Sequence, residues 1–189
     1  MPRPRAFDMN NVLEQAMRVF WKKGFVGTSM SDLYEATGLK PGNLYQAFKD
    51  KDDIFQHAFE HYAGHFRATL PKGLSGLPAI RAWVEIQAKL ATGDPERAGC
   101  LIINTVAERE AHSAATQAMA QGRLREIHEF FARNLVLASE RGELPHETDI
   151  ELEADGLLGA VVSIMTLGRA GADRRVIEHV AEKALHSLK

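Results

Sequence analysis

The chain has 189 residues, of which 45% are hydrophobic and 25% charged, and its formal net charge is −2 at pH 7. These values are ordinary for a globular protein, and no apolar run approaches the roughly 18 residues of a membrane-spanning helix. The start of the chain, MPRPRAFD, lacks the apolar core of a secretory signal, and the single cysteine, Cys100, excludes an internal disulfide. We therefore expect a cytoplasmic protein with no membrane partner.

The charge is divided unevenly along the chain. Residues 1–51 contain eight Lys or Arg and five Asp or Glu, which gives +3 and leaves −5 for the remaining residues. A basic end on an acidic chain is the asymmetry expected when only that end contacts nucleic-acid phosphates. Within it, Arg3 and Arg5 alternate with prolines in an extended arm, which either contacts phosphate or the minor groove or is simply a solvated terminus.

Three helices are expected in this basic end. The first covers residues 8–23 and is ended by Gly24. Residues 28–51 then predict two short helices joined by a tight turn, because apolar residues recur at helical spacing on each side of Gly38. A helix, a turn containing glycine and a second helix form the helix-turn-helix unit, which inserts its second helix into the major groove of DNA.

Local signals support both short helices. Ser29 and Asp32 are spaced as a capping box at the start of the first one. Gly38 tolerates the positive φ that such a helix end commonly needs, and Pro41 suits the first turn of the second helix. The break between the two helices is therefore expected at Gly38, and the second helix is expected to begin at Pro41.

The same segment resembles the tetracycline-repressor (TetR/AcrR-like) family of bacterial transcription regulators. The residues that carry the resemblance are Phe20, Gly24, Phe25, Thr28, Ser29, Asp32, Leu33, Ala36, Gly38, Leu39, Gly42, Leu44, Tyr45, Phe48 and Lys51. The resemblance implies an all-α fold with an N-terminal three-helix helix-turn-helix DNA-binding domain at residues 1–51. It further implies a connecting helix at residues 52–70 and a helical effector-binding and dimerisation domain at residues 71–189.

We expect the second helix of the unit to contact double-stranded DNA in the major groove. Asn43 and Gln46 carry amides that can pair with adenine edges, and the resemblance places Tyr45 and Lys51 on phosphates. Each polar side chain taken alone is equally typical of a solvated helix surface. The expected DNA-binding residues are Thr28, Ser29, Lys40, Pro41, Gly42, Asn43, Leu44, Tyr45, Gln46 and Lys51.

The expected connecting helix carries a row of histidines. His57, His61 and His65 recur every four residues, and two histidines at that spacing can hold a metal ion. No cysteine or obvious set of carboxylates flanks them in the sequence, and three solvated histidines on one helix face would look the same. We therefore predict no metal site and no cofactor.

The rest of the chain predicts a helical body after a Pro- and Gly-rich linker at residues 70–78. Its helices are expected at residues 79–91, 98–110, 113–140, 149–169 and 173–188. The resemblance implies a cavity among them for a small-molecule effector, which we expect to be apolar or aromatic and held by few polar groups, such as Asn104 or Gln87. The same apolar side chains are typical of an ordinary core. The candidate lining residues are Trp83, Ile86, Leu90, Cys100, Ile103, Asn104, Ile127, Phe130, Phe131 and Met165.

The last two helices are apolar over more surface than one neighbouring helix can cover, and small residues are interspersed along them. Surplus apolar surface favours an oligomer interface. In the family that the chain resembles, the last two helices pair with their copies as a four-helix bundle, which implies a homodimer. The candidate interface residues are Leu157, Leu158, Val161, Val162, Met165, Val176, Val180 and Ala184.

An enzyme is disfavoured, because the sequence contains no Gly-rich phosphate loop, no Gly-x-Ser-x-Gly elbow, no His-Glu-x-x-His pattern and no cysteine pair for zinc. A helical module for protein contacts would leave the polar, basic helix-turn-helix surface unexplained. We predict a homodimeric transcription regulator, a repressor that a small effector releases from a near-palindromic operator. The alternative is a regulator that responds to electrophiles or oxidants through Cys100, which requires an accessible thiolate.

Overall fold

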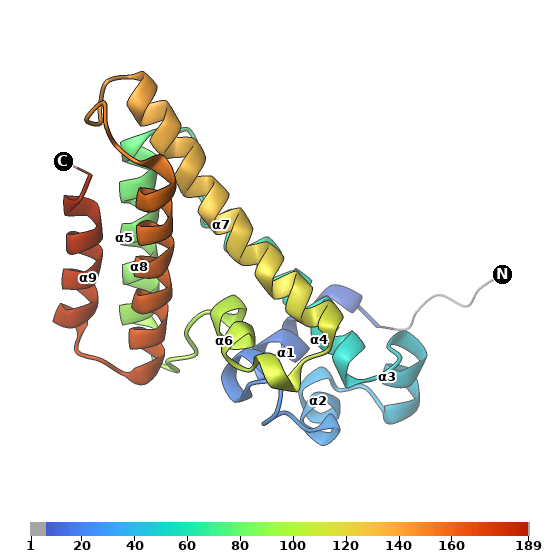
Figure 1. Ribbon diagram of the computed structural model, residues 1–189. Helices are drawn as coiled ribbons and strands as arrows, with labels where there is room; N and C mark the ends of the chain where they lie inside the picture. Colours follow the sequence, from blue (N-terminus) through green and yellow to red (C-terminus); the bar gives the residue numbers. More distant parts are fainter. Residues whose placement is uncertain (1–6, 189) are drawn as a thin grey trace.

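The computed structural model describes residues 7–188, which form nine α-helices and no strand (Figure 1). The expected arm with Arg3 and Arg5 lies outside the described residues. In chain order the helices are α1 (Met9–Lys23), α2 (Met30–Thr37), α3 (Pro41–Ala47), α4 (Lys51–Ala68), α5 (Leu77–Gly93), α6 (Leu101–Ala107), α7 (Ala114–Glu140), α8 (Ile150–Ala170) and α9 (Arg174–His186), with a short 3-10 turn at Arg109–Ala111 between α6 and α7. The expected all-α class is confirmed. No helix in this part of the chain is both long and apolar enough to cross a membrane.

Side-chain caps set most helix starts. Asp8, Ser113 and Asp149 each accept a hydrogen bond from a backbone N–H in the first turn of α1, α7 and α8, which satisfies a donor that the helix itself cannot. The largest departure from expectation is α6, which begins at Leu101 although a helix was expected from residue 98. Gly99 has a φ of 69°, which interrupts a helix immediately before α6.

The elements form two connected groups (Figure 1). Helices α1, α2 and α3 lie with α4 at one end, α5, α8 and α9 lie side by side at the other, and α7 runs between the two ends. The core of the second group centres on Trp83 of α5, whose ring lies 5.0 Å from Phe130 and 5.3 Å from Phe131 of α7. Such aromatic pairs stabilise the packing beyond their buried area.

Helices α5 and α8 approach each other closely at Gly168 of α8. A Cβ added to Gly168 of α8 would lie 2.8 Å from the carbonyl oxygen of Ala91 in α5, so a larger residue there would push the helices apart. This crossing brings the C-terminal ends of α5 and α8 beside the loop that precedes α6.

Candidate nucleic-acid interface

The helix-turn-helix unit is built from α2, a short turn and α3. Ser29 and Asp32 form the expected capping box: the Asp32 N–H donates to Ser29 Oγ over 3.1 Å, and the Ser29 N–H donates to Asp32 Oδ2 over 2.8 Å. Gly38 ends α2 in the left-handed region with a φ of 67°, a conformation that glycine adopts without steric strain. Pro41 then occupies the first turn of α3.

Helix α3 is anchored by two apolar side chains and presents the rest of its surface outward. Leu44 and Phe48 are 0% and 4% exposed. Asn43, Tyr45 and Gln46 are exposed, as are the three residues before Asn43. The Tyr45 phenol forms a hydrogen bond with Tyr34 of α2, which raises the pKa of Tyr34. Helix α3 therefore offers amides and a positioned hydroxyl along one accessible face.

Two residues expected at the DNA surface, Thr28 and Leu44, have buried side chains, and a third, Lys51, is half-buried. The Thr28 side chain is 1% exposed, and its hydroxyl donates to the Gly24 carbonyl over 2.7 Å. Leu44 is 0% exposed and belongs to the hydrophobic core, where it anchors α3. Lys51 is half-buried with Nζ 4.4 Å from the centre of the Phe25 ring, and burial lowers its pKa. Thr28 and Leu44 therefore position the unit, and their side chains do not reach its surface.

The helix-turn-helix unit is joined to the body by residues that the sequence reasoning missed. The Phe25 N–H donates to Glu108 Oε2 over 2.8 Å, and a Cβ added to Gly24 would lie 2.1 Å from Glu108 Oε1. At the start of α7, Thr116 Oγ1 donates to the Asp52 carboxylate at the start of α4 over 3.0 Å. The N-terminal end of α7 therefore connects the body to the end of the molecule that carries the helix-turn-helix unit.

His112 fills the centre of this joint. Its ring is 4.7 Å from both Phe25 and Phe55, the residue is 6% exposed, and neither ring nitrogen has a hydrogen-bond partner among residues 7–188. Burial lowers the pKa of His112, while the carboxylates of Glu108 and Asp52 oppose that shift. The neutral imidazole therefore packs as an aromatic ring.

This burial predicts a pH-dependent stability. In the unfolded chain His112 binds a proton below about pH 6.5, whereas in the folded chain it does so only at a lower pH. The free energy of unfolding therefore decreases as the pH falls below about 6.5. We expect His112→Leu to flatten this dependence. Urea midpoints of both proteins at pH 8 and pH 5.5 measure it, and equal decreases in the two proteins would contradict the assignment.

A cavity of about 450 Å³ opens between α1, α4, α5, α8 and the loop before α6. Of the expected effector-lining residues it brings together Leu90 and Met165, with the neighbouring Gln87. Gln87 is 0% exposed, and neither atom of its amide has a hydrogen-bond partner within the part of the chain that the structure describes. The remaining lining residues are Trp21, Tyr62, His65, Phe66, Thr69, Lys89, Ala91, Gly93, Asp94, Arg97, Gly99 and Gly168.

The other expected effector-lining residues lie outside this cavity. Trp83, Ile127 and Phe130 surround a separate cavity of about 30 Å³, which is too small for an effector. Residues lining neither cavity are Ile86, Cys100, Ile103, Asn104 and Phe131. The sequence reasoning missed Trp21, Tyr62 and Phe66 as lining residues. The spacing of Tyr62 and Phe66 on one helix face was a usable signal, and Trp21 offered none.

The chain is similar to known proteins over nearly its whole length. Residues 12–58 match the family described as bacterial regulatory proteins, tetR family, and residues 76–184 match the tetracyclin repressor-like C-terminal domain. The chain belongs to the TetR family. It is therefore a transcriptional regulator and not an enzyme.

Two TetR-family relatives and one solved structure illustrate the similarity. The HTH-type transcriptional repressor ComR of Escherichia coli (strain K12) is 28% identical over 188 residues, which cover 97% of this chain and 90% of ComR. The uncharacterized HTH-type regulator YezE of Bacillus subtilis (strain 168) is 30% identical over 186 residues, covering 95% and 96%. A cysteine mutant of the TetR-family regulator CifR, complexed with 26-bp operator DNA, is 27% identical with a TM-score of 0.82, covering 99% of this chain and 100% of CifR.

Helices α8 and α9 of this TetR-family chain share an open apolar face. Its apolar residues are Val176, Val180 and Ala184 of α9 with Gly156 and Ala160 of α8, and His179 and Lys183 of α9 lie at the same hollow. Leu158 and Val162, also expected at a dimer interface, are half-buried. Three other expected interface residues lie in the core of the chain itself. They are Leu157, Val161 and Met165, which are 1%, 1% and 5% exposed because α8 packs against α5 and α7.

Cys100 precedes α6 and is 1% exposed. Burial raises the pKa of its thiol, despite a hydrogen bond with Tyr62 that lowers it. A protonated, enclosed thiol is a poor nucleophile. These properties are typical of an inert structural cysteine and do not favour a sensor role in this TetR-family protein.

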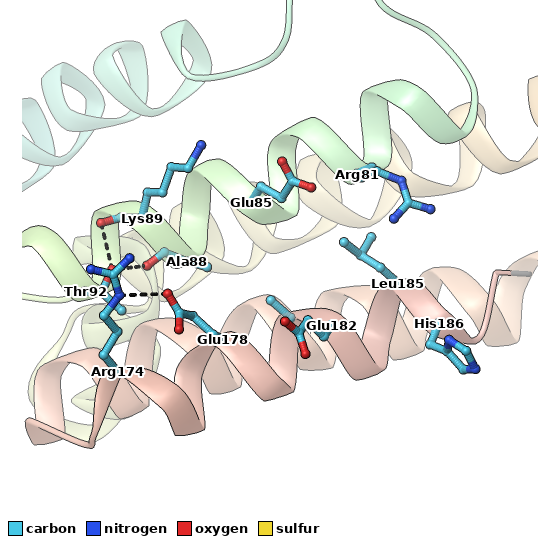
Figure 2. A pocket seen from close by; sticks show the side chains of 11 residues that line it. Arg81, Glu85, Ala88, Lys89, Thr92, Arg174, Glu178, Glu182, Leu185 and His186 are labelled. Carbon is cyan, nitrogen blue, oxygen red and sulfur yellow. Dashed lines mark hydrogen bonds and ion pairs between the residues drawn. The ribbon is translucent and has the colours of Figure 1, made fainter.

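A surface groove of about 500 Å³ lies between α5 and α9 (Figure 2). Arg81, Glu85 and Lys89 of α5 line one wall, and Arg174 and Glu178, paired over 2.7 Å, belong to the other. No expected effector-lining residue lines this groove. Its charged walls are less suited to an apolar effector than the cavity that contains Gln87.

Proposed function

We propose that this regulator is a homodimeric repressor that binds a near-palindromic operator through α3 and is released by a small apolar or aromatic effector. The exposed polar face of α3, held by buried Leu44 and Phe48, is the observation that carries the proposal. It presents Asn43 and Gln46 where a recognition helix contacts base edges. ComR is named a repressor and CifR is complexed with operator DNA, which supports the same role here.

The proposal assigns residues 1–51 to DNA binding, 52–70 to the connection and 71–189 to effector binding and dimerisation. The protein would act in the cytoplasm, where the chromosome lies. Effector binding and operator binding would each weaken the other. The reason is that the effector binds more tightly to the conformation of the dimer in which the two α3 helices are not positioned to contact the operator.

The proposal is tested by selecting DNA from a random pool with the purified protein at a stated salt concentration. We expect a near-palindromic site whose half-sites are about 34–36 Å apart, one helical turn, or slightly more. Recovery of only salt-sensitive, sequence-independent binding would contradict operator recognition.

Base recognition by Asn43 leads to a specific prediction. Asn43→Ala should relax sequence preference at one position in each half-site, at a cost of about 1–3 kcal/mol for the preferred base. The measurement is repeated selection, followed by titration of site variants. Tyr45→Phe is the matched control: it removes a hydroxyl proposed to contact phosphate, so binding should weaken similarly on all sequences. Unchanged selectivity in Asn43→Ala would exclude base contact by this residue.

The proposed homodimer rests on the open face of α8 and α9. Gly156 and Gly159 lie on the exposed side of α8, and a Cβ added to either would meet nothing within 4 Å in the described chain. Glycine in a helix interior costs about 1 kcal/mol relative to alanine. Two such residues on one surface are explained by the close approach of another helix, and the same face of a second copy is self-complementary in a two-fold dimer.

The proposed effector site is the cavity containing Gln87, because its aromatic walls suit an apolar ligand and Gln87 supplies a donor and an acceptor. A buried amide without partners destabilises the effector-free protein. We therefore expect Gln87→Leu to raise the free energy of unfolding by about 1–3 kcal/mol, measured by urea unfolding of effector-free protein, while operator binding is retained. A lower stability in Gln87→Leu would show that the amide is hydrogen-bonded in the folded protein and would remove it from the proposed site.

A further inference from the structure

Three potential metal ligands from two helices meet on the surface of the protein. Glu14 of α1, 24% exposed, and His61 and His65 of α4 each offer one ligand atom, and these atoms lie within 4.8 Å of one another. The His61 Nε2 is 3.1 Å from Glu14 Oε2, and the His65 Nε2 is 3.9 Å from the same oxygen. Both imidazoles therefore direct the same ring nitrogen at one carboxylate oxygen.

The carboxylate is held in this orientation by a neighbour. Arg18, one turn further along α1, donates from Nε to the other Glu14 oxygen, Oε1, over 2.8 Å. An arginine that fixes one oxygen and leaves the second directed at the histidines acts as an outer partner of a ligand. The two histidines are four residues apart on α4, so the helix itself places their rings side by side, with centroids 4.8 Å apart.

His57 belongs to the same row but not to this cluster. Its Nδ1 lies 2.8 Å from the Asp53 carbonyl oxygen, and its ring packs edge-on against Phe48 at 5.4 Å. The periodic row of three histidines in the sequence thus divides into a pair that shares a carboxylate and a third that does not.

We propose that Glu14, His61 and His65 bind a divalent first-row transition metal ion, of which Zn²⁺ is the representative. Imidazole nitrogen and carboxylate oxygen are ligands that Zn²⁺ takes at about 2.0–2.2 Å, so ligand atoms around a tetrahedral ion are about 3.3 Å apart. The present separations reach this value through small side-chain rotations. Binding displaces any proton from the two Nε2 atoms and leaves the carboxylate ionised.

Two consequences follow from the position of this site. The ligands join α1 of the DNA-binding end to α4, so a bound ion cross-links these helices. Three protein ligands leave a fourth position open, as in metal sites that accept water or another ligand. His65 also lines the cavity that contains Gln87, so the proposed metal site lies beside that cavity. The sequence predicted no such site because Glu14 is separated from His61 by 47 residues.

The test uses untagged protein from which metal has been removed with EDTA. Zn²⁺ is titrated into this protein, and binding is measured by isothermal titration calorimetry. We expect one Zn²⁺ per chain in the wild type. Glu14→Gln, His61→Ala and His65→Ala should each weaken binding by about 10-fold or more, since loss of an outer partner alone typically costs 10–100-fold. Co²⁺ in place of Zn²⁺ should give the visible absorption of a tetrahedral N/O site, and each of the three variants should lose it.

Two control variants make the result specific. His57→Ala removes a histidine from the same helix face and should leave Zn²⁺ affinity unchanged. His128→Ala removes the histidine that lies 3.3 Å from Asp155 and 3.6 Å from Glu151, a second surface cluster, and should also have no effect. Zn²⁺ affinity that survives in Glu14→Gln and His61→Ala, or that is lost in His128→Ala, would overturn the proposal. Metal-free circular dichroism of each variant establishes that it is folded, and none of these measurements depends on DNA.

Discussion

Replacing Ala160 with arginine is expected to make the protein monomeric and to weaken binding to a near-palindromic operator by about 100-fold or more, because the two DNA-binding ends then no longer act together. Ala160 lies on the open face of α8 and α9, beside Gly156 and opposite Val180 and Ala184. A guanidinium placed there meets solvent in the monomer, so the chain should still fold. In a dimer it would be buried without a partner, which costs several kcal/mol per ion.

Sedimentation equilibrium and operator titration measure the two parts of this result separately. Ala118→Arg is the control, because Ala118 is an exposed alanine in another long helix, α7, away from the α8 and α9 face, whereas Ala160 is half-buried. The control should remain dimeric and bind the operator as the wild type does. A dimeric Ala160→Arg protein would show that the interface lies on another surface.

Truncating Trp83 to alanine should produce the largest loss of stability, a decrease of about 3–5 kcal/mol in the free energy of unfolding. The side chain is 0% exposed and contacts aromatic rings from two helices, Phe66 of α4 and both Phe130 and Phe131 of α7. Its indole N–H also donates to Thr69 Oγ1 over 3.1 Å. Removing the indole ring leaves a cavity and removes packing contacts between α4 and helices α5 and α7.

Urea unfolding at one fixed protein concentration measures this loss, since the unfolding of a dimer depends on concentration. Trp83→Phe keeps an aromatic ring and loses the hydrogen bond to Thr69, so it should cost much less, about 1–2 kcal/mol. Equal losses in the two variants would show that the hydrogen bond, and not the ring packing, supplies the stability.

The helices could be located from the sequence because their ends are encoded locally. Ser29 with Asp32 and the left-handed Gly38 specify the ends of α2 without reference to the rest of the chain. The start of α6 was misplaced because apolar periodicity continues through residues 98–103, whereas the backbone turns at Gly99. Periodicity alone does not show such a break.

Sites assembled from distant segments were harder to predict. Glu14 meets His61 only because α1 packs on α4, and no local pattern in the sequence indicates that contact. Similarly, apolar residues on α8 could be assigned to an interface from composition, but only the packing of α5 and α7 shows that Leu157 and Val161 face inward. The sequence predicts which residues are apolar, and the fold determines which neighbour covers them.

Helix α7 is a single segment of 27 residues whose N-terminal end touches α4 through Asp52. At 1.5 Å per residue it is about 40 Å long. If a rigid helix of that length tilts by about 5° around one end, its other end moves by about 3.5 Å. This distance is close to the rise of one base pair along DNA. In the proposed mechanism, a small change in the body is therefore large enough, at the other end of α7, to shift the recognition helix by about one base pair of the operator.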